Sequence, residues 1–240
     1  ETYIPLYTML ARLADEGVPY RLTISLSPTL MSMCRDSLLQ ARFSEFLDGL
    51  CRLAELETSR TRWQHAFHET SKMYLERFQH VRSVYHDALH GDVIGGYARL
   101  ADEGRIELIT TAATHGYLPL MEVCPSAARA QIIAAASYYR NTFGHGPRGM
   151  WLPECGYYPG VDAYLREAGV RYFFTDAHGI ENASPRPRYG VYAPIYCPSG
   201  VAAFGRDMES SKQVWSAHEG YPGDFDYREF YRDIAYDLDW

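Results

Sequence analysis

A single carboxylate that directly follows a short apolar segment is the first candidate for chemistry in this sequence. Residues 148–156 read Arg-Gly-Met-Trp-Leu-Pro-Glu-Cys-Gly. Because proline has no backbone N–H to donate to a sheet, Pro153 predicts that a strand ends here and that Glu154 lies in the loop beyond it. Parallel α/β folds place their reactive groups in such loops. Glu154 is therefore a candidate catalytic group, with a plain loop residue or a buried ion-pair partner as the alternatives.

Three more polar side chains follow predicted strands. His115 comes after a strand at 105–111, and Asp176 and His178 come after a strand at 172–175. By geometry alone Asp176 is a plausible partner for Glu154, because both carboxylates follow predicted parallel strands and so would lie at the same face of the fold. Two simpler interpretations stay open: Asp176 caps the following turn, and His115 is a structural histidine with satisfied hydrogen bonds.

Helices and strands that alternate with short connections would position these side chains. The crossover rule then predicts parallel strands with helices outside, and so a barrel or a doubly wound sheet, between which periodicity does not choose. A loop rich in Pro, Arg and Ser precedes a hairpin-like segment. We expect helices at 2–16, 36–57, 58–89, 91–103, 126–143 and 161–169, strands at 21–26, 105–111, 148–152 and 172–175, the loop at 182–188, and the hairpin at 191–205.

Composition narrows the classes of function. The 240 residues, 47% of them hydrophobic, fit one large α/β domain or most of one. A net charge of -7 without a long basic run argues against nucleic acid as a partner, and no apolar run approaches the roughly 20 residues of a membrane span. Five irregularly spaced cysteines indicate reduced thiols and hence a cytoplasmic protein. The 14% aromatic content suits stacking on sugar rings, although aromatic residues also build cores.

The segment Trp151 to Tyr157 resembles the part of glycoside hydrolase family 57 that holds the catalytic nucleophile. Four further blocks resemble the branching-enzyme branch of this family, in the same order along the chain. They lie at 26–30, 104–119, 174–178 and 213–233. The resemblance implies an incomplete (β/α)7 barrel with helical insertions. Residues 1–240 would form part of its catalytic domain, with a helical insertion at about 36–90.

The resemblance also implies roles for individual residues. Glu154 would attack the anomeric carbon of an α-glucan such as glycogen or amylose, so that an α-1,4 bond is cleaved and an α-1,6 bond is formed. No metal ion or organic cofactor is expected, because a covalent glycosyl-enzyme divides the barrier into two steps. Trp215 would stack on sugar, and Tyr189, at the tip of a flexible loop, would cover the donor and exclude water. His115, Asp176 and His178 would bind or orient the sugar.

Two pieces of the family pattern are absent from this sequence. None of the nine histidines forms the usual His-x-His-x-Pro block. The second catalytic carboxylate, an Asp, is expected C-terminal of Trp240. We therefore expect an internal portion of a longer enzyme. The alternatives are a 4-α-glucanotransferase or amylase of the same family, a non-catalytic glucan-binding module, and a metal-dependent deacetylase-like barrel, which Asp176 and His178 suggest.

Overall fold

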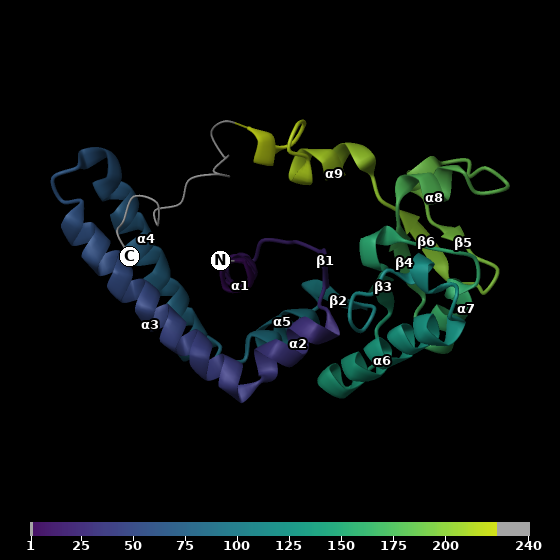
Figure 1. Cartoon of the computed structure of the whole chain (residues 1–240), viewed down its shortest axis with the longest axis horizontal. Coiled ribbons are helices and arrows are strands. Elements are labelled where there is room, and N and C mark those ends of the chain that lie inside the picture. The colour runs from purple at the N-terminus through teal and green to yellow at the C-terminus, as the bar shows by residue number, and fades with distance from the viewer. Residues whose placement is uncertain (1, 225–240) are drawn as a thin grey trace.

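A six-stranded sheet forms the centre of the computed structural model, which describes residues 2–224 (Figure 1). Its strands lie in the order β1-β2-β3-β4-β6-β5. All neighbours are parallel except β5 and β6, which pair antiparallel. The strands are β1 (Leu22–Ser25), β2 (Ile106–Thr111), β3 (Gly149–Trp151), β4 (Tyr172–Thr175), β5 (Ile195–Tyr196) and β6 (Ala202–Gly205).

Helices cover the outer face of the sheet and build two apolar cores. One core holds Leu10, Tyr97 and Leu108 and joins the sheet to helices near the start of the chain, and the other holds Ile132 and Phe173. The helices are α1 (Tyr3–Asp15), α2 (Pro28–Arg35), α5 (Val93–Asp102), α6 (Pro125–Phe143) and α7 (Val161–Glu167). The predicted α/β fold with parallel strands is confirmed, and the sheet is the described portion of the expected incomplete (β/α)7 barrel.

Aromatic side chains line the inner face of the sheet. Trp151 of β3 lies 5.8 Å from Phe174 of β4, and Phe174 lies 5.9 Å from Phe204 of β6, measured between ring centroids. These three residues are register partners on adjacent strands, so their side chains point to the same face. Part of the high aromatic content therefore packs between strands.

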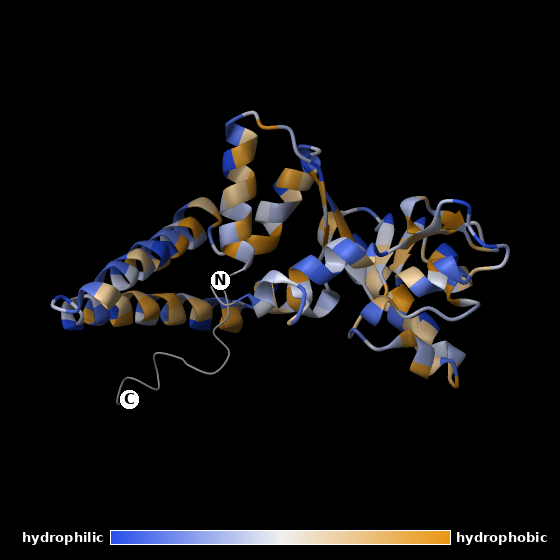
Figure 2. Ribbon diagram, turned by 90° about the horizontal axis from the view of Figure 1, so that it is seen from above, coloured by the Kyte–Doolittle hydropathy of each residue, from blue (hydrophilic) through white to orange (hydrophobic). Residues whose placement is uncertain are grey.

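A long antiparallel pair of helices projects away from the sheet (Figure 1). It consists of α3 (Ser37–Arg60) and α4 (His65–Ser83), followed by the π-helical turn η1 (Val84–Ala88). Figure 2 shows hydrophilic residues along much of both helices, whereas hydrophobic residues gather on the strands and the helices packed against them. This pair accounts for the helical stretch expected at about 36–90.

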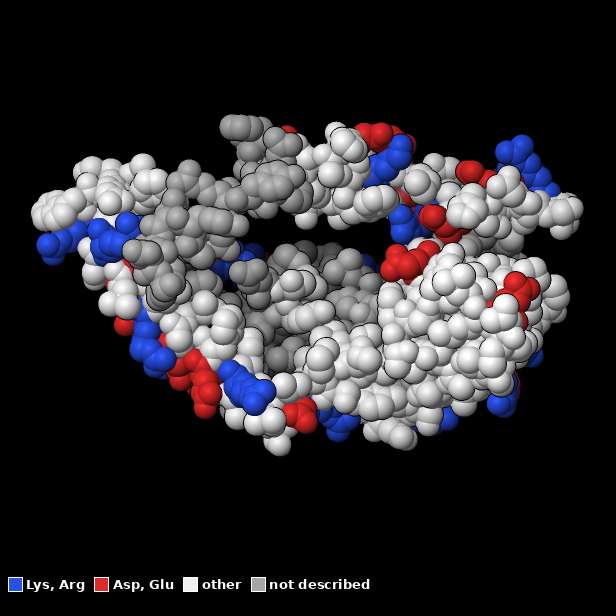
Figure 3. All heavy atoms as spheres, in the orientation of Figure 1, with Lys and Arg blue, Asp and Glu red and all other residues white. Residues whose placement is uncertain are grey.

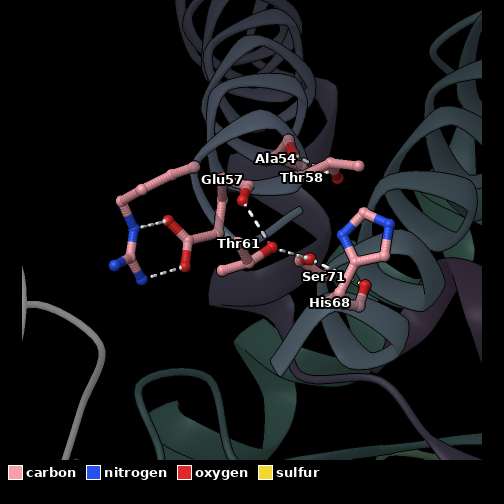
Figure 4. Close-up of polar contacts among 7 residues, drawn as sticks. Ala54, Glu57, Thr58, Thr61, His68 and Ser71 are labelled. Carbon is pink, nitrogen blue, oxygen red and sulfur yellow. Dashed lines mark hydrogen bonds and ion pairs between the residues drawn. The ribbon is translucent and has the colours of Figure 1, made fainter. Parts of the chain in front are cut away.

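The break between these two helices lies at residues 61–64, not after residue 57 as predicted. Backbone and hydroxyl groups of Thr61 both donate to the Glu57 carbonyl, which continues α3 through its last turn. The buried Thr61 and Ser71 hydroxyls then meet at 2.7 Å and join α3 to α4 (Figure 4). A contact between the two helices therefore determines where α3 ends and α4 begins. Helix propensity along the sequence did not reveal this boundary.

The chain after β4 differs most from the predicted elements. The hairpin expected at 191–205 is confirmed as β5 and β6, but β6 also pairs parallel with β4 and so extends the main sheet. Two helices in this region were not predicted, α8 (Ala177–Glu181) and α9 (Met208–Trp215), and nor was α2 earlier in the chain. The Asp207 side chain accepts from the Ser210 N–H at the start of α9, a capping signal that was present in the sequence. Within residues 2–224, no helix is both long and apolar enough to cross a bilayer.

Asp162 ties the β5–β6 hairpin to α7. Its side chain is buried, with 4% of the residue exposed. The Tyr157 hydroxyl donates to one carboxylate oxygen at 3.2 Å, and the Ser199 backbone N–H donates to the other at 3.1 Å. Burial by itself raises the pKa of Asp162, but hydrogen bonds from Ser199 and Tyr157 outweigh it and leave the pKa below its usual value.

We expect Asp162→Asn to lower the free energy of unfolding by about 1–3 kcal/mol at pH 7, because a buried hydrogen-bonded carboxylate is lost. The pKa is lower in the folded chain than in the unfolded chain. The stabilisation is therefore complete above the unfolded value of about 3.9 and is lost as the pH falls through the folded value. Urea unfolding between pH 3 and pH 7 measures the difference. The difference in free energy of unfolding between the variant and the unaltered protein should become smaller below about pH 4. Asp15→Asn, at the exposed end of α1, is the control. A difference that does not change with pH would contradict this role.

Candidate active site

The turn that carries Glu154 follows β3 directly and has an unusual backbone conformation. Pro153 ends the strand, and residues Pro153–Cys155 form one 3-10 turn. Both Glu154 and Cys155 have positive φ, at 51° and 55°. Each such non-glycine residue costs on the order of 1 kcal/mol or more, so the surrounding contacts must hold the turn in place. The result is a carboxylate that projects outward, with 78% of its side chain exposed.

The loop after β2 brings His115 beside this carboxylate. The His115 Nε2 lies 3.5 Å from Glu154 Oε1, and its Nδ1 lies 3.4 Å from the Thr111 hydroxyl at the end of the strand. His115 also has positive φ, at 57°. Since β2 and β3 are parallel neighbours, their carboxyl ends open at one edge, and the two side chains meet there.

Asp176 belongs to a second group of contacts just beyond β4. It occupies the position before α8, but its side chain accepts no capping hydrogen bond, so the interpretation of Asp176 as a turn cap is wrong. Its Oδ2 lies 3.7 Å from His178 Nδ1, and its Oδ1 lies 3.8 Å from Arg206 Nε. Asp176 is therefore held between a histidine and an arginine.

Sequence reasoning did not identify Arg206. The residue directly follows β6, as Glu154 and Asp176 follow β3 and β4. A charged residue just after a strand was therefore the available signal. It was missed because residues 191–205 were interpreted as a separate hairpin and not as part of the main sheet. The parallel pairing of β6 with β4 moves Arg206 to the same edge of the sheet.

The two aromatic candidates are placed differently. Trp215 ends α9 and is 60% exposed, and the Arg206 guanidinium lies 5.8 Å from the centre of its ring. Tyr189 is also exposed and lies at the start of the turn η4 (Gly190–Tyr192), with the Arg188 guanidinium 5.3 Å from its ring. In the part of the chain that the structure describes, the Tyr189 ring has a cation–π contact with Arg188 and no hydrogen bond or ring contact with another candidate. The motif at 227–233 lies outside the described residues.

Charged side chains of both signs gather where the α9 segment faces the rest of the molecule across a hollow (Figure 3). The thiol of Cys155 is buried, and burial raises its pKa, with nearby Arg206 acting in the opposite direction. That shift keeps the thiol protonated and supports a packing role for Cys155. Across residues 2–224, no three His, Cys, Asp or Glu side chains are arranged to hold a metal ion.

A separate cavity of about 600 Å³ lies at the opposite, amino-terminal ends of β1, β2 and β3. Arg21, Glu107 and Arg148 contribute to its lining, and Arg148 Nε lies 4.0 Å from Glu107 Oε1. Active sites of barrels built from parallel strands lie at the carboxyl ends, where Glu154 is found. We therefore place the candidate active site at the edge with Glu154 and not at this cavity.

Close packing of Gly156 joins the Glu154 turn to the loop after His115. A methyl group at Gly156 would lie 2.4 Å from the Tyr117 ring and 3.0 Å from Pro119. We expect Gly156→Ala to separate the two loops and to destabilise the protein by about 1–3 kcal/mol, as overpacking does. Thermal unfolding measures the change. Gly49→Ala in α3 is the control, because it meets nothing within 4 Å and gains helix propensity. Equal unfolding midpoints for the two variants would disprove the close packing.

Comparisons with known proteins agree with the resemblance seen in the sequence. The profile of the family described as glycosyl hydrolase family 57 matches residues 1–238. A 1,4-alpha-glucan branching enzyme of Thermococcus kodakarensis is 36% identical over 97% of this chain and 38% of its own length. The crystal structure of the alpha-amylase AmyC from Thermotoga maritima is 44% identical, with a TM-score of 0.92, over 100% of this chain and 45% of that one.

A third similar protein is a branching enzyme of the same family. The crystal structure of the GH57-type branching enzyme from Pyrococcus horikoshii is 35% identical, with a TM-score of 0.88, over 97% of this chain and 45% of that one. The chain therefore spans less than half the length of each of these three relatives. Their names include both a hydrolase and branching enzymes.

Proposed function

The chain belongs to glycosyl hydrolase family 57, and from that membership we propose that it forms part of an α-glucan branching enzyme in which Glu154 is the nucleophile. The observation that carries the proposal is the placement of Glu154. Its carboxylate projects from a strained turn at the carboxyl end of β3, is largely exposed, and lies beside an imidazole. An attacking carboxylate needs this access together with a fixed orientation.

The proposed reaction has two displacements. A Glu154 oxygen bonds to the anomeric carbon as the α-1,4 bond breaks, and a second carboxyl group gives its proton to the leaving oxygen. A 6-hydroxyl of an acceptor glucan then attacks the same carbon. It loses its proton to the second carboxylate and releases Glu154, which leaves an α-1,6 bond.

Asp176 is better suited to orientation than to proton transfer. Both of its oxygens lie near basic side chains, and Oδ1 is buried. These contacts fix the orientation of both oxygens, whereas the acid of a retaining pair must reach the leaving oxygen of the donor. We therefore assign the second carboxylate to an Asp C-terminal of this chain, as the family pattern implies.

The other candidates would bind and orient the glucan. His115 can donate one N–H to Glu154 or to a sugar hydroxyl. The ring of His178 lies beside Asp176 and is largely exposed. The exposed indole of Trp215 offers a face for the apolar side of a glucose ring. These contacts would hold an α-glucan across the carboxyl ends of β2, β3, β4 and β6.

Transfer to a glucan, in place of hydrolysis, requires a bound acceptor and the exclusion of water. Tyr189 is proposed to cover the donor, because it lies exposed at the end of the loop rich in Pro and Arg. The relatives include both an alpha-amylase and branching enzymes, so product analysis for α-1,6 linkages distinguishes the two activities.

We expect Glu154→Gln, in the complete polypeptide, to lower the formation of α-1,6 linkages on amylose by at least about a thousandfold, because the covalent route is lost. Binding of a linear malto-oligosaccharide should change little. The exposed Glu122→Gln is the matched control and should stay active. Retained transfer by Glu154→Gln would remove the assignment. Amylose binding without turnover by the unaltered protein would instead support the glucan-binding module.

Tyr189→Ala should raise the ratio of hydrolysis to transfer several-fold, because water then reaches the glycosyl-enzyme more easily. Released reducing ends and new α-1,6 linkages, measured in one reaction, give this ratio. Tyr192→Ala is the control, because Tyr192 is exposed in the neighbouring turn. An unchanged ratio, or an equal change in both variants, would show that Tyr189 does not act as a cover.

A further inference from the structure

We propose that Arg206 is a positioning residue that holds the nucleophile turn, Asp176 and the indole of Trp215 in one arrangement. The proposal rests on the proposed function, because it concerns the same site. It assigns to Arg206 no contact with the reacting atoms. Its basis is that three elements separated in sequence meet at one guanidinium.

The backbone of Arg206 is anchored to the sheet. Its N–H donates to the Thr175 carbonyl at 2.9 Å, which continues the pairing of β4 with β6 by one residue. The hydroxyl of the same Thr175 donates to the Cys155 carbonyl at 3.1 Å, and this bond is buried. Thr175 therefore links the backbone at Arg206 to the strained turn that carries Glu154.

The side chain of Arg206 then reaches three partners. Its Nε lies 3.8 Å from Asp176 Oδ1, and its Nη1 lies 3.8 Å from the Cys155 sulfur. The guanidinium carbon lies over the Trp215 ring, 5.8 Å from its centre. Only 26% of the side chain is exposed. The planar guanidinium has several nitrogens, so it can approach a carboxylate and a sulfur while it also lies over an indole. A lysine ammonium is a single point charge and cannot make all three contacts in this way.

The Glu154 turn and helix α9 both depend on contacts with other parts of the chain. The turn at Glu154 and Cys155 contains two consecutive residues with positive φ, and such strain persists only when neighbouring contacts hold it. Helix α9 has no buried residue, so little apolar packing fixes Trp215. A cation–π contact from a side chain anchored in the sheet limits where the indole lies relative to Glu154.

Removal of the guanidinium should therefore affect two kinetic constants. In the complete polypeptide, we expect Arg206→Met to lower kcat for branching of amylose by about tenfold to a hundredfold, because the nucleophile is less well oriented. KM should rise as well, because Trp215 loses its support. Arg206→Lys keeps a positive charge beside Asp176 but loses the planar guanidinium. Its kcat and KM should therefore lie between those of the unaltered protein and those of Arg206→Met. Arg52→Met, at an exposed position of α3, is the matched control.

A double-variant cycle separates positioning from a general loss of stability. If Arg206 acts on glucan affinity through the indole, Arg206→Met should raise KM far less in a Trp215→Ala background than in the unaltered protein. Independent multiplication of the two KM effects would overturn the proposal. So would kcat and KM values for Arg206→Met equal to those of Arg52→Met. If Arg206→Met does not fold, Arg206→Lys is carried through the same cycle.

The outcome also distinguishes this proposal from the proposed function. If the unaltered protein forms no α-1,6 linkages, the branching assignment fails. The role of Arg206 is then measured from the affinity for a linear malto-oligosaccharide, with the same four proteins of the cycle. If the unaltered protein branches amylose but Arg206 and Trp215 show no coupling, only the positioning role fails.

Discussion

The strained turn at the end of β3 is the constraint on which the rest of the site depends. Proline ends the strand, and two consecutive non-glycine residues with positive φ then turn the Glu154 carboxylate outward. Such a conformation is unfavourable in an isolated peptide. It is held here because β3 lies between β2 and β4, and because the Thr175 hydroxyl at the end of β4 donates a hydrogen bond to the Cys155 carbonyl in the turn.

The site combines a firmly held part with a loosely held part. Glu154 and His115 extend from adjacent strands, and their loops pack tightly at Gly156. Trp215 and Tyr189 lie on segments with little buried surface. This division suits the proposed chemistry, because the attacking group needs a fixed geometry, whereas a glucan chain must enter and leave. Arg206 lies between the two parts and connects the loosely held indole to the sheet.

Two different kinds of polar contact maintain the region after β4. Asp162 is buried and satisfied by hydrogen bonds, so it fixes the β5–β6 hairpin against α7. Asp176 is closer to solvent and has ionic neighbours at 3.7 and 3.8 Å without a capping hydrogen bond. The first contact contributes to the stability of β6, and β6 in turn brings Arg206 to the second.

The sequence by itself determined the parallel α/β fold, the end of β3 before Pro153 and the placement of Glu154 in the loop beyond it, because hydrophobic alternation and the missing proline N–H are local properties. It also identified Asp176 and Trp215 as candidates. Tertiary structure decided the turn between α3 and α4 through the Thr61–Ser71 contact. It also decided the role of β6, because pairing with β4 depends on residues far apart in the chain. That pairing brings Arg206 to Asp176, Cys155 and Trp215, a convergence that no spacing along the sequence encodes.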